Sequence, residues 1–277
     1  MPRQNVSLLS FNHGKISPQG LARTDLDRAK LSAETQINYI PKVLGPMTIR
    51  PGLGFIGSTY QDKKAFHVPF VASTDDTALL EFTDMNMRVR INDEIVTRNS
   101  VSTAVTNGTF GSNLSSWTDA DQSGAASVWV TGGYMGLTGT GFNSAIRKQT
   151  LTISAPDQNV EHAIRIVVTK GVVNFKIGST DGDNDLLGNV TIYPGTHSLA
   201  FTPTSSAAYM EISSTTKYQS LVDSITIEAA GDMVVPTIWP ESSLFSLRYA
   251  QSIDVTFMAN YGYRPQRIER HGAHSWA

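Results

Sequence analysis

Two groups of residues in this sequence have side chains that could hold a metal ion. Asp181-Gly-Asp-Asn-Asp185 places three carboxylates in one loop, but an EF-hand loop needs Gly at its sixth position and Glu at its twelfth. Those positions are Leu186 and Ile192, so a polar hairpin tip is the favoured interpretation. His271 and His274 have no third ligand at a suitable spacing. We therefore predict no metal site and no cofactor.

The sequence lacks the motifs of the common enzyme classes. It contains no Gly-x-Ser-x-Gly elbow, no Walker loop and no His-Glu-x-x-His pair. Cys is absent, which excludes thiolate chemistry and disulfide bonds. We expect that the protein is not an enzyme.

Aromatic and basic side chains offer two further kinds of chemistry. Trp129 and Tyr134 could stack against sugar rings, although alternating strand positions favour a structural role for both. Arg264, Arg267 and Arg270 recur at every third position and could contact passing DNA. Ion pairs on the surface or between subunits are the favoured interpretation of these arginines. For Trp129 and Tyr134, a glycan-binding site is the weaker hypothesis and a structural role in the strands is the favoured one.

Composition bounds the function classes. The 277 residues carry 22 Lys and Arg against 24 Asp and Glu, so the net charge of −2 implies no strong attraction to nucleic acid or membranes. Charged residues make up only 17%, and turn-forming residues are plentiful, as in all-β proteins. The sequence has no secretory h-region and no apolar run of about 18 residues. It predicts a soluble protein made in a cytosol.

The elements that would position these side chains fall into three regions. Strands are predicted over 65–71, 78–83 and 87–92, the last with a polar face of alternating arginines. Two short helices are expected before them, one near Thr24 and one from Ser32 to Pro41.

A different pattern covers residues 104–229. Short apolar alternations separated by turn signals predict about eight strands, enough for a two-sheet jelly roll. We expect 162–169 to form a hairpin with 172–177, and 189–193 with 197–202. After residue 230 the sequence again resembles the pattern of residues 1–103. The fold class is therefore mainly β, a split β-rich domain (1–103 and 230–277) with an inserted β-sandwich (104–229) and few short helices.

Several elements outside the insert resemble one family in order and spacing. They are Phe11-Asn-His-Gly-Lys-Ile-Ser-Pro18, Ala22-Arg-Thr-Asp-Leu26, Asn38-Tyr-Ile-Pro41, Arg50-Pro-Gly-Leu53, the Pro-Phe and Leu-Glu-Phe strands near residues 69 and 81, and Gln251-Ser-Ile-Asp254 with the following Arg…Trp276 element. This set resembles the N-terminal portion of podovirus-type phage tail tubular (nozzle) proteins. Members of that family are usually much longer and lack the insert.

The resemblance implies a structural protein of the virion tail, assembled in the host cytoplasm. It implies a homo-oligomeric ring, a hexamer by the family's pattern, that contacts the head–tail adaptor, portal-proximal proteins and other tail proteins. The subunit interface would then include residues of the N-terminal elements: Phe11, Pro18, Arg23, Asp25, Arg50 and Pro51.

The insert resembles the jelly rolls of carbohydrate-binding modules. Asn107-Gly-Thr-Phe110 with Trp117 is similar to their opening motif, and 221–227 to their closing strand. Many such modules hold a structural Ca²⁺ between an opening Glu and a closing Asp; here Gly111 replaces the Glu, which leaves Asp223 alone. A host surface glycan is the ligand that this resemblance implies. The alternative function is accordingly a carbohydrate- or receptor-binding accessory protein of a phage.

Overall fold

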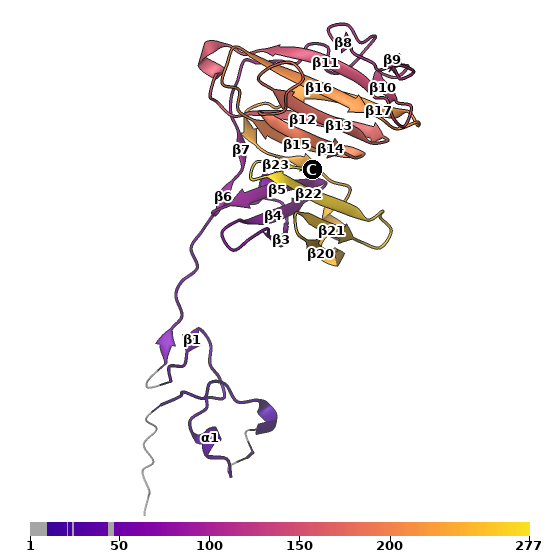
Figure 1. Cartoon of the computed structure of the whole chain (residues 1–277). Coiled ribbons are helices and arrows are strands. Elements are labelled where there is room, and N and C mark those ends of the chain that lie inside the picture. The colour runs from indigo at the N-terminus through magenta and orange to yellow at the C-terminus, as the bar shows by residue number, and fades with distance from the viewer. Residues whose placement is uncertain (1–9, 21, 24, 44–46) are drawn as a thin grey trace, which may run out of the picture. The chain divides into compact units, whose positions relative to one another are not determined.

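The chain forms two compact units, residues 1–56 and 57–277, in this computed structural model (Figure 1). The structure describes residues 10–20, 22–23, 25–43 and 47–277. Strands dominate, and among the described residues the helices are one α-helical turn and short 3-10 turns, which confirms the mainly β fold class. The helical elements are η1 (Pro18–Gly20), α1 (Asp27–Lys30), η2 (Tyr60–Asp62), η3 (Ala155–Asp157) and η4 (Glu241–Ser246). Within the described ranges, no helix is long and apolar enough to cross a membrane.

The N-terminal unit contains a two-stranded sheet of β1 (Tyr39–Ile40) and β2 (Thr48–Ile49). The helix predicted from Ser32 to Pro41 is wrong. Ala33 instead exchanges backbone hydrogen bonds with a distant segment, accepting from Ile16 N at 3.0 Å and donating to Gly14 O at 2.9 Å. These long-range backbone pairings override the local helix signals. Thr24, the predicted start of the first helix, lies outside the described residues.

The unit of residues 57–277 begins with an antiparallel sheet of β3 (Phe66–Val71), β4 (Thr77–Thr83) and β5 (Asn86–Ile91), joined by β6 (Glu94–Ile95) and β19 (Val235–Pro236). The three predicted strands are confirmed. The arginines do share one face of the third strand, but the alternation wrongly predicts a half-buried strand, because Arg88 and Arg90 are also buried, against Glu81.

Two sequence-distant regions share the core of this part. The C-terminal strands β20 (Arg248–Ser252), β21 (Val255–Ala259), β22 (Gln266–Gly272) and β23 (Ser275–Trp276) pair in antiparallel order. Trp276 packs edge-on against Phe70 with ring centroids 5.0 Å apart, and Trp239 packs against Phe82 at 5.7 Å. The segments before and after the sandwich therefore bury their aromatic rings in one cluster.

Ten strands between residues 118 and 227 form the β-sandwich, where about eight were expected. One sheet contains β9 (Ala126–Val130), β10 (Tyr134–Thr138), β17 (Ser220–Ile227), β12 (His162–Lys170) and β15 (Gly195–Phe201). The other contains β8 (Thr118–Asp119), β11 (Ala145–Thr152), β16 (Ala207–Ser214), β13 (Val173–Gly178) and β14 (Leu187–Ile192). Apolar side chains from both sheets fill the space between them.

Both predicted hairpins are wrong. β12 pairs with β15 and β17, whereas β13 pairs with β14 and β16, so the chain crosses from one sheet to the other at Gly171. Gly171 has φ +77°, and a Cβ there would lie 2.8 Å from Ser220 Cα. β14 and β15 are likewise in opposite sheets. The polar loop 181–185 does connect a hairpin, that of β13 and β14, as predicted.

The sandwich shares a sheet with the strands around it. β23 pairs with β15 through Trp276 and Ser198, which joins β20–β23 and five sandwich strands into one nine-stranded sheet (Figure 1). The chain enters the sandwich after β7 (Thr97–Arg98) and leaves it before β18 (Gly231–Asp232), and these two strands pair. The compact units divide at residue 56; the domain boundaries 1–103, 104–229 and 230–277 stay a prediction.

The motif Asn107-Gly-Thr-Phe110, at the start of the sandwich, packs against its last strand and against Trp117. Ile225 N donates to Gly108 O at 2.8 Å, and a Cβ on Gly108 would lie 2.0 Å from Ile225 O. Trp117 is buried, donates Nε1–H to Asn107 O at 3.2 Å and packs against Phe110. The motif therefore closes one end of the sandwich.

Candidate functional site

The N-terminal unit buries none of its described residues. Its large apolar side chains are exposed instead. They are Leu26, Ile37, Tyr39, Ile40, Val43, Ile49, Leu53, Phe55 and Ile56. Folding gains stability chiefly by removing apolar surface from water, so this unit gains little stability from its own packing, and exposed apolar surface of this kind is typical of interaction sites.

The predicted interface residues lie in this unit, and several of them also hold its turns. Arg23 and Asp25 form a bidentate ion pair with both N–O distances at 2.8 Å, and both remain exposed. Arg50 donates from Nε to Asn38 Oδ1 at 2.8 Å. Phe11 is partly exposed, while Pro18 and Pro51 are exposed. Their role at a subunit interface stays a prediction.

A buried ionic cluster holds the start of the second unit. Ser58 O accepts hydrogen bonds from Arg88 and Arg90, each at 2.9 Å. Glu81 accepts from both guanidinium groups and, at 3.0 Å, from Tyr60 N. Burial alone would raise the pKa of Glu81, but the hydrogen bonds from Arg88 and Tyr60 hold that pKa below its ordinary value. The chain after residue 57 is therefore fixed to β4 and β5.

Trp129 and Tyr134 lie on opposite faces of the β9–β10 hairpin. Trp129 is opposite Met135 in the register, and cross-strand partners share a face. Tyr134 precedes Met135 and so points to the other face. Trp129 is 37% exposed, and its indole donates Nε1–H to Phe110 O at 2.7 Å. One flat ligand could not stack on both rings.

Nothing in the sequence indicated a hollow that lies where β15, β19 and β22 meet. It has a volume of about 550 Å³, and Tyr193, Ile238, Trp239 and Arg267 contribute to its lining. The Arg267 guanidinium lies 3.6 Å from the centre of the Tyr193 ring. Turn residues such as Tyr193 carry no local signal that would have indicated this arrangement.

A second hollow of about 470 Å³ continues the first. The two share Tyr193 and Glu269, and the second extends along residues 187–191 of β14. Across from β14 it is lined by Asp254, Val255 and 269–271. We call the two together the junction groove.

His197 is a buried titratable group beneath this groove. Burial lowers the pKa of His197 from 6.5 to about 4, although its Nε2 donates to Tyr193 O at 2.8 Å. Its Nδ1, Trp239 Nε1 and Thr237 Oγ1 are buried without a hydrogen-bond partner among the described residues. His197 is therefore neutral at pH 7.

Two of the three arginines singled out near the C-terminus, Arg267 and Arg270, form ion pairs within the chain, whereas no side-chain hydrogen bond or ion pair involves Arg264 among the described residues. Arg267 pairs with Glu269 at 2.8 Å, and Arg270 pairs with Asp76 and Asp254. His274 Nδ1 contacts Glu161 at 2.8 Å. In the described part of the chain, no three His, Cys, Asp or Glu side chains are arranged to hold a metal ion. Contact with DNA stays a prediction.

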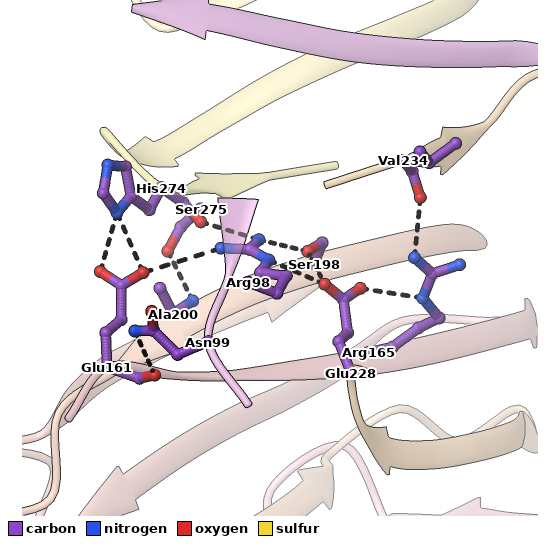
Figure 2. A network of polar contacts seen from close by, with 10 residues as sticks. All are labelled: Arg98, Asn99, Glu161, Arg165, Ser198, Ala200, Glu228, Val234, His274 and Ser275. Atoms are coloured by element: carbon purple, nitrogen blue, oxygen red, sulfur yellow. Dashed lines mark hydrogen bonds and ion pairs between the residues drawn. The ribbon is translucent and has the colours of Figure 1, made fainter. Parts of the chain in front are cut away.

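A polar network connects the sandwich to the surrounding strands (Figure 2). Glu228, directly after β17, accepts hydrogen bonds from Arg98, Ser198 and Arg165, each at 2.8 Å. Arg98 also donates to His274 O at 3.0 Å. The side chains of Arg98 and Glu228 are only 2% and 4% exposed. The network thus connects the chain just before the sandwich to the chain just after it.

Comparison with known proteins gives a partial likeness in structure. No family model and no curated protein matches the chain. A solved structure described as "CBM4 structure and function", a carbohydrate-binding module, matches with 13% sequence identity and a TM-score of 0.29. That match covers 48% of this chain and 99% of the other. Part of the chain is therefore similar in structure to a carbohydrate-binding β-sandwich.

Proposed function

We propose that the protein is a structural subunit that assembles with copies of itself through the N-terminal unit, as a ring component of a phage tail. The observation that carries the proposal is the N-terminal unit, in which no described residue is buried while many large apolar side chains are exposed. The order and spacing of its Pro-, Gly- and Arg-containing elements resemble those of tail nozzle proteins. Neighbouring copies, the head–tail adaptor and other tail proteins are the proposed partners.

The mechanism is assembly through repeated contacts. A contact between two different surfaces closes into a ring when its rotation allows, and each modest interface is then multiplied by symmetry. The anchoring of Ser58 by Arg88 and Arg90 supports this role, since it fixes the point at which the second unit begins. The tail of the virion is the proposed location.

Replacing Leu53 and Phe55 by Asp is expected to abolish assembly. The two side chains are 87% and 86% exposed, and burying each in an interface would contribute about 1.5–3 kcal/mol. Their loss should weaken self-association at least about a hundredfold. Light scattering and electron microscopy of the purified full-length chain measure the effect.

Phe142→Asp is the matched control, because Phe142 is an equally exposed aromatic in a sandwich loop. It should leave assembly unchanged. Melting temperatures should agree among all variants, since none of these side chains is in the core. A wild-type chain that stays monomeric at high concentration, with no place in the tail by microscopy, would refute the proposal.

Glycan binding by the sandwich is a second candidate function. The observation that favours it is the half-exposed indole of Trp129, held in place by its hydrogen bond to Phe110 O. Rigid aromatic rings of this kind provide contact area at low entropic cost.

On a glycan array, Trp129→Ala should reduce specific binding at least tenfold. Tyr134→Ala, which alters the opposite face of the same hairpin, should leave that binding unchanged. Absence of binding by the wild-type chain, or equal loss in both variants, would count against this site.

A further inference from the structure

The outer edge of strand β14 has no strand partner. Within the described residues β14 is the last strand of its sheet, bonded only to β13. Five consecutive residues of β14, 187–191, line the junction groove. Successive side chains of a strand point to opposite faces of its sheet. A strand whose consecutive residues all line one hollow therefore faces that hollow with its backbone edge. An unpaired edge of this kind is a template for another strand.

The same chain contains an extended segment without a partner. Residues 52–56, Gly-Leu-Gly-Phe-Ile, form no helix or strand, and we call them the docking segment. Leu53 and Phe55 alternate with Gly52 and Gly54, so their side chains share one face when the backbone is extended. A Cβ on either glycine would meet nothing within 4 Å. The glycine face leaves the backbone open to close approach.

The two surfaces match in length and chemistry. Five extended residues span about 17 Å, and β14 has 6 residues, so the lengths correspond. Tyr193 and Ile238 in the adjoining hollow offer apolar contacts for Leu53 and Phe55. Strand addition gives affinity through backbone hydrogen bonds and specificity through such side-chain contacts.

We propose that the docking segment of one copy adds to the free edge of β14 in a second copy and places its apolar side chains in the junction groove. This inference rests on the proposed function and names the surface that receives the neighbour. The segment and the groove are different surfaces, so the contact is heterologous and repeats from copy to copy. In the single chain Leu53 and Phe55 are uncovered, which leaves them free to engage a neighbour.

A full-length chain with Pro51→Cys and Asn189→Cys tests the proposal by cross-linking. The protein has no cysteine of its own, so a short bis-maleimide can react only at the two introduced positions. Pro51 directly precedes the docking segment, and exposed Asn189 lies in β14; neither substitution alters Leu53 or Phe55. The assembled protein should give a ladder of covalent oligomers on a denaturing gel.

The matched control carries Pro51→Cys with Phe142→Cys, a position of the sandwich away from β14. Its yield of covalent oligomers should be at least tenfold lower. Equal yields, or cross-links only within single chains as shown by mass spectrometry, would refute docking on β14. If such a result comes from particles that light scattering shows to be assembled, the groove proposal fails while the assembly function stands. If the wild-type chain does not assemble, the proposed function and the inference fail together.

Discussion

Glu228→Gln is expected to lower the free energy of unfolding by about 3–5 kcal/mol, the usual cost of leaving a buried charge without its partner. The substitution keeps the shape of the side chain and removes its charge. Arg98 would then have Glu161 as its nearest carboxylate, 4.0 Å away. Chemical denaturation of the wild-type and variant chains at pH 7 measures the difference.

A double-mutant cycle isolates the interaction energy between Arg98 and Glu228 from the effects of their other contacts. Arg98→Met combined with Glu228→Gln should cost less than the sum of the two single substitutions, because neither charge is then buried alone. Asp25→Asn breaks the exposed pair with Arg23 and should have no measurable effect on stability. A Glu228→Gln chain as stable as the wild type would show that solvent reaches Arg98 and that the network does not hold the sandwich in place.

This prediction matters for function because the polar network around Glu228 fixes the sandwich to the strands around it. Arg98 lies just before the sandwich and Glu228 just after it, while Ser198 belongs to β15 and His274 to the turn between β22 and β23. A sandwich held at both of its ends moves with the strands around it. The junction groove, whose walls come from both parts, then keeps a constant shape.

Local patterns in the sequence predicted the strands well and their pairing poorly. Alternation located β3, β4 and β5, and the failed calcium motif correctly indicated a hairpin tip at 181–185. The chain does break between strands at 171–172 and at 193–194, between the paired segments of the two predicted hairpins. Turn signals do not reveal whether the chain returns within its sheet or crosses to the opposite one, since that depends on where both sheets lie.

The candidate sites were harder to predict for a related reason. The alternation of Arg88 and Arg90 indicated a polar face, but only the structure shows that residues 58–60 cover it. Trp129 and Tyr134 are close in sequence, yet the strand register separates their faces. The junction groove combines three segments far apart in the chain, so no local pattern could have indicated it.

Lowering the pH from 7 to 4 is expected to destabilise the protein through His197. The unfolded chain binds a proton at this residue below about pH 6.5, whereas the folded chain does so only below about pH 4. The unfolded state therefore holds more protons between these values, and stability falls as the pH decreases through this range. A difference of about 2.5 pH units corresponds to about 3 kcal/mol.

His197→Gln should remove this part of the pH dependence, because Gln retains an amide donor toward Tyr193 O and does not titrate. Denaturation at pH 7 and pH 4 should show a loss about 3 kcal/mol smaller in the variant than in the wild type. His13→Gln, in the N-terminal unit where no described residue is buried, is the control and should behave like the wild type. Identical losses in all three chains would mean that water reaches His197 in the folded state. His197 lies beneath the junction groove, the surface that we propose receives the neighbouring subunit. The same decrease in pH should therefore weaken assembly of the wild-type chain more than assembly of the His197→Gln chain.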